Sequence, residues 1–413
     1  MRNRGIAGTA SLIISVFALS ETAAAEVTLG DSAVSCVEDP ACINRLHSDI
    51  PMAASADPGE RITFIGRDAF DLDLDPEPAA PDDPTAETGF GVVHALTGPV
   101  SINGARAGDV IAVTIESIVP DDVGWTSTSD FGYAADAVGG EDRFIVWRLN
   151  DRYAESDALP GVRIPNASFP GVIVTLPGPA ELDRVVEREQ ALADAGGVVF
   201  LPDTDTAEPA SLCGEEGSDS QRCLRTIPPR EFGGNVDIRY LREGVTVYLP
   251  CRIDGCGLAV GDFHYAQGDG EVAGTAIEMD GDITVTVRIV DNPPSLARGP
   301  HYEGPASVLA IPSERFYAVT GFPIKRRGEI PREIAYLADA KVADLTNLSM
   351  DVNLAARNAL VEMIDYIVWR WGYDRTQAYM IASVAVDLRI GQLVDAPNVG
   401  VTAILPLDIF VGE

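Results

Sequence analysis

Apolar and polar residues alternate along several stretches of the chain before residue 300. Apolar side chains recur at every second position in "VIAVTIESIV" (110–119), "YLREGVTVYLP" (240–250) and "DITVTVRIV" (282–290). A period of two is typical of a strand with one buried face. The Asn103-Gly104 pair, just before the first run, favours a tight turn. The pattern predicts a strand, a turn and a strand across residues 98–119, within a β-rich region.

The apolar spacing changes after residue 350. Leu360, Ile364 and Ile367 recur at helical spacing, and Gly372 follows as a stop signal. Asp374 is suited to cap a second helix through "RTQAYMIASVAV" (375–386), and "VGVTAILPLDIF" (399–410) predicts a closing strand. We therefore expect an α+β, β-rich protein with a β-sandwich-like core and a helical C-terminal part.

Composition restricts the possible classes of function. The 413 residues are 46% hydrophobic, enough for one large core or two packed subdomains. The formal net charge is -33, from 63 acidic and 30 basic residues. Such a surface repels phosphate groups, so we expect no nucleic-acid binding. The acids are spread along the chain, which indicates a solubility or salt-tolerance trait.

The N-terminal segment has the layout of an export signal. Arg2 and Arg4 precede an apolar run that ends near Leu19, and Ala23 and Ala25 frame a small-residue cleavage site. A retained N-terminal anchor is the alternative. No other segment is apolar for long enough to cross a membrane. We expect a secreted or periplasmic protein that makes no membrane contact after cleavage.

Four segments follow from these patterns. Residues 1–25 are the expected signal peptide, and 26–60 are an irregular lead-in. Residues 61–345 form the β-rich core, with an acidic insertion at about 202–222, and 346–413 form the helical and strand C-terminal part packed on that core.

The cysteines fall in three close pairs. An even number of cysteines in an exported chain favours disulfides, and their proximity favours three local loops. A zinc knot built from "SLCGEEGSDSQRC" and "CRIDGC" is the alternative, although its spacings are longer than those of the usual zinc-binding pair. The six are Cys36, Cys42, Cys213, Cys223, Cys251 and Cys256.

Candidate chemistry is concentrated in "GDFHYAQGDGEVAGTAIE" (261–278). Asp262 and His264 are two residues apart, so on a strand both side chains point to the same face. Glycines at 268 and 270 favour a tight loop for the acids that follow. Imidazole with carboxylates is a ligand set suited to Zn²⁺, Mn²⁺ or Fe²⁺. A surface turn in an acidic protein is the alternative interpretation.

Two other places were weighed as sites. His94 is a possible further ligand, although a histidine flanked by apolar residues is more often part of a core. Asp71, Asp73 and Asp75 alternate in a way that resembles a calcium loop. No closing bidentate Glu follows them, and alternation also describes the wet face of a strand.

The region resembles the acetamidase/formamidase family. The resemblance is carried by "GGNVD" (233–237), "YLPC" (248–251), "GCGLAVGDFH" (255–264) and "AQGDGEVAGTAIE" (266–278). Two further segments, at 94–113 and 378–410, are also similar to the family, so the resemblance covers roughly residues 60–410. Cys251 and Cys256 depart from it, because they stand where the family usually has Val and Ala.

The resemblance implies hydrolysis of small amides, such as formamide or acetamide, to ammonia and a carboxylate. It also implies a β-sandwich-like fold and a metal site. We expect a divalent metal ion, zinc in the first place, a small amide substrate and a homo-oligomer. Asp109 and Asp387 match the family outside the central motif. Carried residue by residue, the positions that match the central motif are Asn235, Asp237, Asp262, His264, Gln267, Asp269, Glu271 and Glu278. From the chemistry of the side chains we expect catalysis by Glu271, Asp269 and Asn235, metal binding by Asp262, His264, Glu278 and His94, and substrate binding by Asp237 and Gln267.

The expected mechanism is attack by metal-activated water, with Glu271 as the general base. One rival uses Cys251 as a nucleophile. It lacks a nearby lysine, since the only two are Lys325 and Lys341. Another rival is a non-catalytic exported protein that binds a metal or small ligand on the same fold.

Overall fold

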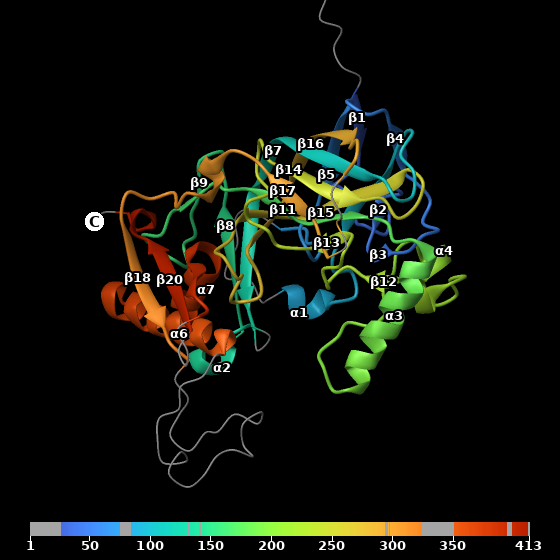
Figure 1. Cartoon of the computed structure of the whole chain (residues 1–413). Helices are drawn as coiled ribbons and strands as arrows, with labels where there is room; N and C mark the ends of the chain where they lie inside the picture. Colours follow the sequence, from blue (N-terminus) through green and yellow to red (C-terminus); the bar gives the residue numbers. More distant parts are fainter. Residues whose placement is uncertain are drawn as a thin grey trace, which may run out of the picture.

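The computed structural model describes residues 26–74, 84–129, 132–139, 142–293, 296, 298–323, 351–394 and 399–411. A large curled sheet occupies the centre of the molecule, with the C-terminal helices on one side and helix α3 on the other (Figure 1). The predicted α+β architecture with a helical C-terminal part is confirmed. The expected signal peptide, residues 1–25, lies outside the described residues.

Thirteen strands form the large sheet, whose main path runs β13-β11-β15-β16-β7-β14-β17. Strand β15 pairs with β11, β16 and β6 along different parts of its length, and bulges interrupt its pairing with β16 and β6. Strands that change partners at bulges turn the corners of sandwich-like sheets. The strands are β1 (Glu26–Leu29), β2 (Cys42–Ile43), β4 (Ala54–Ala56), β5 (Arg61–Gly66), β6 (Leu96–Ile102), β7 (Val110–Thr128), β8 (Arg143–Arg148), β11 (Phe169–Thr175), β13 (Gly233–Asn235), β14 (Thr246–Pro250), β15 (Cys256–Ala266), β16 (Ile277–Ile289) and β17 (His301–Glu303).

Strands β6 and β7 form where the alternation predicts them, but they do not pair with each other. β6 pairs with β15, β2 and β4, whereas β7 pairs with β16, β14 and β8. The segment expected to be an irregular lead-in contributes short strands: β1 lies parallel to β5, and β4 lies parallel to β6. The sheet therefore gathers partners from distant parts of the chain.

The C-terminal part adds a second layer. Helix α6 (Val352–Trp371) ends at Gly372, whose φ of 76° is the left-handed conformation that glycine adopts easily. Helix α7 (Arg375–Ala385) begins with a capping box between Asp374 and Gln377. A three-stranded sheet in the order β18-β20-β19 lies beside them (Figure 1). Its strands are β18 (Phe316–Gly321), β19 (Asp387–Gln392) and β20 (Gly400–Pro406).

The remaining elements are short, apart from helix α3. Two small sheets pair β9 with β10 and β3 with β12. The helices are α1 (Pro84–Thr88), α2 (Ala135–Val138), α3 (Pro179–Asp194) and α4 (Ala210–Cys213), the 3-10 helices are η1 (Ser220–Arg222), η2 (Ala306–Leu309) and η4 (Leu407–Ile409), and the small strands are β3 (Arg45–Leu46), β9 (Tyr153–Ala154), β10 (Ile164–Pro165) and β12 (Leu224–Arg225).

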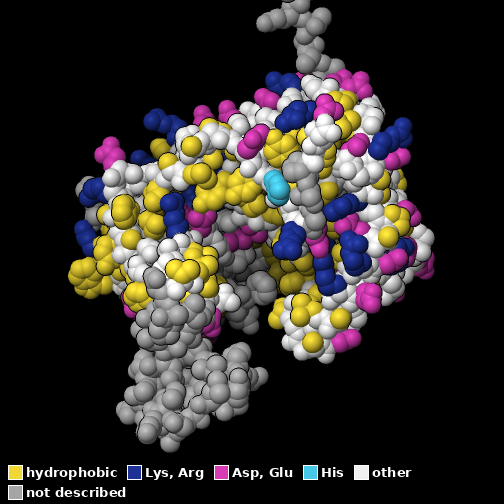
Figure 2. Space-filling model, in the orientation of Figure 1, with side chains coloured by type: hydrophobic (Ala, Val, Ile, Leu, Met, Phe, Trp, Pro, Cys, Tyr) yellow, Lys and Arg dark blue, Asp and Glu magenta, His cyan; other side chains and the backbone are white. Residues whose placement is uncertain are grey.

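The largest hydrophobic core lies between the large sheet and the C-terminal helices. It includes Ile283 of β16, Leu360 and Met363 of α6, and Tyr379 of α7, all fully buried. Three disulfides join neighbouring cysteines: Cys36–Cys42, Cys213–Cys223 and Cys251–Cys256. Acidic side chains are scattered over the face shown in Figure 2. Among the described helices, none combines the length and apolarity that a membrane span requires.

Candidate active site

The candidate active site lies where β15, β16 and the loop between them meet strand β13. β15 carries Asp262 and His264, and β16 carries Glu278. The connecting loop, residues 267–276, carries Glu271. Asp237 follows β13. Strand β11 lies between β13 and β15 and pairs with both. Residues about 40 positions apart in sequence therefore reach one place in the sheet.

Four carboxylates surround the imidazole of His264. Its Nε2 lies 3.3 Å from Asp262 Oδ1 and 3.1 Å from Glu278 Oε2. Ligand atoms of Asp237, Asp262 and His264 lie within 4.8 Å of one another, as do those of His264, Glu271 and Glu278. We call these five residues the His264 cluster. Asp262, His264 and Glu278 are at most 2% exposed, so the cluster is not a surface turn.

Strand β11 makes room for the cluster. A Cβ at Gly171 would come within 2.6 Å of Asp262 Oδ2, 2.7 Å of Asp237 Oδ1 and 2.8 Å of His264 Cε1. Only glycine leaves that space to the three side chains. Two positions earlier, Phe169 meets the imidazole edge to face, with ring centroids 5.0 Å apart. β11 thus sets both the position of His264 and the space beside it.

The backbone is strained at three members of the cluster. Asp237, Asp262 and Glu271 have φ values of 42°, 56° and 42°, in the left-handed region. Such conformations cost about 1–3 kcal/mol each in non-glycine residues and persist only where the surroundings over-determine them. They gather at functional sites, which is where the chain places them here.

Gln267 fixes the orientation of the imidazole. Its side-chain amide donates to the backbone oxygen of Asp237 at 3.1 Å, which leaves Oε1 to accept a hydrogen bond from His264 Nδ1 at 3.0 Å. With a proton on Nδ1, the ring turns Nε2 toward the carboxylates. Burial alone would lower the pKa of His264, but the charges of Glu278 and Asp262 outweigh it and raise that pKa well above its ordinary value. Gln267 thus contacts His264 and the backbone of Asp237, and its expected role in substrate binding stays a prediction.

The surroundings of the cluster give its carboxyl groups different pKa values. Burial raises the pKa of Asp237 to about 8, and the charge of Asp262 adds to the rise. Burial acts on Asp262 in the same direction, but His94 and His264 outweigh it and hold its pKa at about 2. Burial also raises the pKa of Glu271 well above its ordinary value, with Asp237 contributing. Groups whose environments separate their pKa values in this way are suited to acid and base roles.

The His264 cluster fits a divalent cation. Asp237 Oδ1 and Glu278 Oε2 are buried and accept no hydrogen bond of good geometry, although Glu278 Oε2 lies 3.1 Å from His264 Nε2. Buried carboxylate oxygens without a donor are costly, and a cation between them removes that cost. One imidazole with several carboxylates matches the ligands preferred by zinc, manganese and iron. The cluster is therefore a candidate metal centre.

His94 lies at the edge of the cluster, and Asn235 ends strand β13 two residues before Asp237. His94 Nε2 is 3.7 Å from Asp262 Oδ2, and its Nδ1 is buried without a hydrogen-bond partner. Burial lowers the pKa of His94, which favours the neutral ring that a metal ligand needs. Asn235 Oδ1 is also buried without a partner, so it remains free to accept a hydrogen bond.

Asp269 is not among the residues whose ligand atoms converge in the cluster. Its Oδ2 accepts a hydrogen bond from the Tyr240 hydroxyl at 2.7 Å, and its backbone N–H donates to Asp387 Oδ1 at 3.4 Å. Asp387 in turn pairs with Arg239. The catalytic role expected for Asp269 is therefore not supported by its position. Asp109, the other outlying family position, accepts the backbone N–H of Arg106 at 2.8 Å and shapes a turn.

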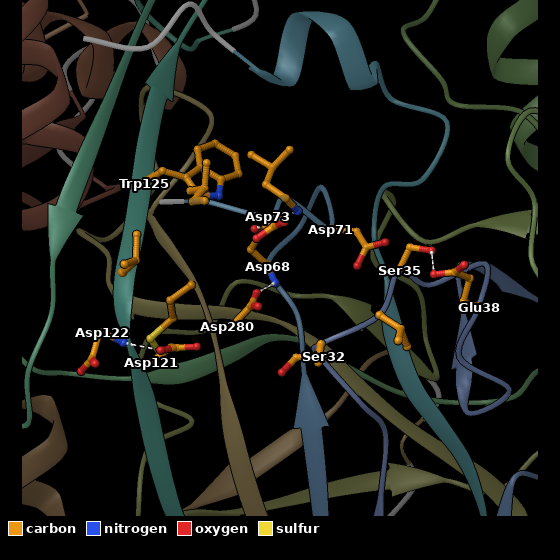
Figure 3. Close-up of a pocket in the computed structure, with 16 residues that line it drawn as sticks. Ser32, Ser35, Glu38, Asp68, Asp71, Asp73, Asp121, Asp122, Trp125 and Asp280 are labelled. Carbon is orange, nitrogen blue, oxygen red and sulfur yellow. Dashed lines mark hydrogen bonds between the residues drawn. The ribbon is translucent and has the colours of Figure 1, made fainter. Parts of the chain in front are cut away.

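A second acidic region is a cavity of about 650 Å³ (Figure 3). None of the candidate catalytic, metal-binding or substrate-binding residues lines it. Among the described residues, no three of its acids bring ligand atoms as close together as in the His264 cluster. Its acids come from two loops and from β7 and β16: Glu38, Asp68, Asp71, Asp73, Asp121, Asp122 and Asp280.

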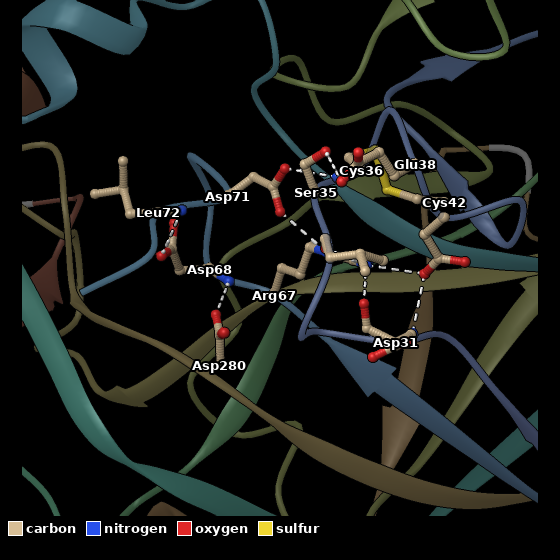
Figure 4. A network of polar contacts seen from close by, with 12 residues as sticks. Asp31, Ser35, Cys36, Glu38, Cys42, Arg67, Asp68, Asp71, Leu72 and Asp280 are labelled. Atoms are coloured by element: carbon tan, nitrogen blue, oxygen red, sulfur yellow. Dashed lines mark hydrogen bonds and ion pairs between the residues drawn. A yellow bond between two sulfur atoms is a disulfide. The ribbon is translucent and has the colours of Figure 1, made fainter. Parts of the chain in front are cut away.

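Several acids of this cavity have protein partners. Asp68 accepts the backbone N–H groups of Phe70 and Leu72, and Asp280 accepts that of Asp68 at 2.8 Å. Asp71 pairs with Arg67 at 3.0 Å (Figure 4). The calcium loop weighed for Asp71 and Asp73 thus gains no support, and Asp75 lies outside the described residues.

Cys251 is not available as a nucleophile, because it is fully buried and bonded to Cys256. The same bond, with the other two disulfides, leaves no cysteine for a zinc knot. Both rival interpretations of the cysteines are therefore wrong for this structure.

A β-rich fold with a buried histidine–carboxylate cluster is the arrangement of a candidate hydrolase site. The chain matches the model of the acetamidase/formamidase family over residues 31–411, and it belongs to that family. It is 30% identical over 389 residues to the formamidase of Methylophilus methylotrophus, covering 89% of each chain. It is 30% identical over 370 residues to the acetamidase of Mycolicibacterium smegmatis, covering 82% of this chain and 84% of that one.

A solved structure agrees with this assignment. The gamma lactamase from Delftia acidovorans superposes with a TM-score of 0.80 at 29% identity, covering 94% of each chain. Family membership over most of the chain makes this protein an amidohydrolase that acts on small amides.

Several residues of the site were not indicated by sequence patterns. Gly171 and Phe169 lie in an apolar run that reads only as a strand, and Tyr240 opens another. Their functions depend on which strands become neighbours, and a local pattern does not carry that information.

Proposed function

We propose that the protein is exported and hydrolyses small linear amides of the formamide and acetamide type with the help of a divalent cation, zinc in the first instance. The observation that carries the proposal is the convergence of buried carboxylates on His264 Nε2 at 3.1 and 3.3 Å. His264, Asp262 and Glu278 would hold the cation, with Asp237 as a further ligand and His94 beside them. The cation supplies Lewis acidity, which polarises the amide carbonyl and lowers the pKa of water.

The chain's own residues then divide the proton transfers. Glu271 takes a proton from the attacking water and passes it to the leaving nitrogen. Burial raises the pKa of Glu271 above its ordinary value, and a carboxyl group that can hold a proton is able to act later as the acid. Asn235 Oδ1, buried without a partner, accepts a hydrogen bond from the substrate NH₂ group. The carbon–nitrogen bond breaks, and a carboxylate and ammonia are released.

Export is proposed from two observations. Residues 1–25 have the layout of a signal peptide, and three disulfides suit an oxidising compartment. Mass spectrometry of the protein from a native host would test the proposal. An N-terminus near residue 26 supports it, whereas an intact Met1 contradicts it. Light scattering of the purified protein would test the expected homo-oligomer.

The decisive experiment removes the metal. Purified protein is analysed for bound elements, dialysed against a chelator, and assayed for ammonia release from formamide and acetamide before and after zinc is restored. Activity that is lost with the metal and returns with it supports the mechanism. Full activity after verified metal loss contradicts it. Metal binding without ammonia release from any amide favours the non-catalytic alternative.

A cyclic amide is the second candidate substrate. The specific observation in its favour is the TM-score of 0.80 with a gamma lactamase. Including a five-membered lactam in the same panel separates the two, because ring opening yields an amino acid and no ammonia.

A further inference from the structure

The loop that carries Gln267 and Glu271 is held by residues more than 100 positions further along the chain. It spans residues 267–276 between β15 and β16. Its partners on one side are the end of helix α7 and the beginning of β19, residues 379–387. We call this segment the α7 clamp. Nothing in the proposed chemistry uses its side chains directly.

Ser383 is the centre of the α7 clamp and is fully buried. Its hydroxyl donates to the backbone oxygen of Thr275 at 2.7 Å and accepts the N–H of Ala273 at 3.0 Å. Its own backbone oxygen accepts the N–H of Gly268 at 2.8 Å. One serine thus binds both ends of the loop.

Tyr379 and Asp387 extend the contact on either side of Ser383. Tyr379 lies one helical turn before Ser383, and its buried hydroxyl donates to the backbone oxygen of Val272 and accepts the N–H of Ala134 at 2.8 Å. Asp387 accepts the N–H of Asp269 and is itself held by Arg239. Helical spacing places Tyr379 and Ser383 on the same face of α7, and Asp387 follows as the first residue of β19.

Glycine brings the loop into direct contact with the clamp. A Cβ at Gly268 would lie 2.3 Å from the backbone oxygen of Val386 and 2.8 Å from its nitrogen. The two backbones are therefore packed against each other with no side chain between them. A contact this close transmits the position of α7 to the loop.

The conformation of Glu271 makes such support necessary. Its φ of 42° is unfavourable for a residue with a long side chain. Glu271 N–H donates to Gly268 at 3.1 Å, and Gly274 N–H donates to Glu271 at 2.9 Å. These turns hold Glu271 in its strained conformation only while the ends of the loop are fixed.

We propose that Tyr379, Ser383 and Asp387 are positioning residues for amide hydrolysis, because they hold the 267–276 loop so that Glu271 keeps its place beside His264 in the cluster. The proposal rests on the role of Glu271 as the base in the proposed function. Asp262, His264 and Glu278 lie on β15 and β16, outside the loop. Loosening the loop therefore impairs proton transfer while leaving most of the metal site in place.

The test compares Ser383→Ala with Thr175→Val. Thr175 lies in β11 and is also fully buried, and its hydroxyl donates to the backbone oxygen of Pro250 at 2.7 Å. The control variant therefore loses a hydrogen bond of similar length away from the loop. Tyr379→Phe is a second clamp variant. For each protein we would measure kcat, KM, metal content and hydrogen exchange of the peptide covering residues 267–276.

We expect Ser383→Ala to lower kcat about 10- to 100-fold, as supporting residues around metal centres commonly do, with KM within about threefold and full metal content. Exchange in the loop speeds up, and Tyr379→Phe follows the same pattern. The inference is overturned if Thr175→Val loses as much kcat, or if the loop exchanges faster in Ser383→Ala while kcat stays at the wild-type value.

Glu271→Gln separates this result from the proposed function. Full activity in Glu271→Gln rejects the base role, and with it the reason for positioning Glu271, whatever Ser383→Ala does. A strong loss in Glu271→Gln together with an unchanged kcat in Ser383→Ala rejects the α7 clamp alone.

Discussion

The His264 cluster and the acidic cavity are both rich in carboxylates, yet they differ in how these groups are arranged. In the cluster, four acids surround one imidazole, and two carboxylate oxygens are buried without a hydrogen bond of good geometry. In the cavity, seven acids line about 650 Å³, and its buried member Asp68 is satisfied by backbone N–H groups.

The difference teaches that the number of acids is a poor guide to a site in a protein with a net charge of -33. Carboxylate groups that converge on a shared point and lack protein hydrogen-bond donors indicate a site for a bound cation. Acids that accept backbone hydrogen bonds or pair with an arginine, as Asp71 does with Arg67, stabilise local structure instead.

The largest effect should come from His264→Ala, since it removes the residue shared by both ligand sets. Polarisation by a bound cation is worth several kcal/mol, so we expect kcat/KM to fall by at least about 10³, together with loss of bound metal. The exposed His301 provides a control, and His301→Ala should retain wild-type activity. Retention of metal and activity in His264→Ala would remove the distinction between the two acidic regions.

Glu271→Gln should be next, with a fall in kcat of about 10² to 10⁴, the range for loss of a general base. Asp269→Asn is the matched control within the same loop, because Asp269 faces Tyr240 and lies outside the cluster. We expect Asp269→Asn to cost less than tenfold. Steady-state ammonia assays measure both, and equal losses would mean that position relative to the cluster does not decide function.

Removing the disulfide beside the cavity should affect stability alone. Cys36–Cys42 closes a loop with a sequence separation of 6, and loop entropy for such a ring gives about 2 kcal/mol of stabilisation. The double variant with Ala at both positions should unfold at lower denaturant with its kcat intact. A loss of kcat in the folded variant would connect the cavity to catalysis.

The smallest effect is a pH-dependent gain from Asp280→Asn. Burial raises the pKa of Asp280 to about 7, above its value in the unfolded chain. The contribution of this carboxyl group to the free energy of unfolding is therefore fully present below about pH 4 and is lost as pH rises through about 7. Asn cannot ionise and still accepts the Asp68 N–H.

At pH 8 the Asp280→Asn variant should be more stable by about 1 kcal/mol, less than the pKa alone would give, because the group borders an open cavity. Denaturant unfolding at pH 4 and pH 8 measures the difference. A gain of equal size at both pH values would show that ionisation of Asp280 is not its cause.

Sequence patterns correctly predicted the helix ends, because these depend on residues close together in the chain. Gly372 ends helix α6 and Asp374 caps helix α7 at the positions expected from the sequence. The run at 179–194, by contrast, forms helix α3 without having been singled out. Its Pro179 at the first turn and the acids and arginines that follow are a helix signal that the β-rich surroundings obscured.

Pairing between strands could not be predicted in the same way. The turn at Asn103-Gly104 suggested neighbouring strands, but β6 pairs with β15 and β7 pairs with β16. Alternation fixes which face of a strand is buried and leaves its partner open. For the site, the sequence brought forward Asp262, His264 and Glu278, whereas Gly171 and Ser383 depend on tertiary contacts for their meaning.

The contact between the 267–276 loop and helix α7 also orders events in time. A ribosome makes the loop more than 100 residues before it makes Tyr379. A nascent chain can thus contain the complete set of ligand residues while the base-bearing segment still lacks its anchor. Hydrolytic competence would then arise as a late, all-or-none step in maturation, after the second layer has docked, and fragments that stop short of α7 should be inert even if they capture a cation.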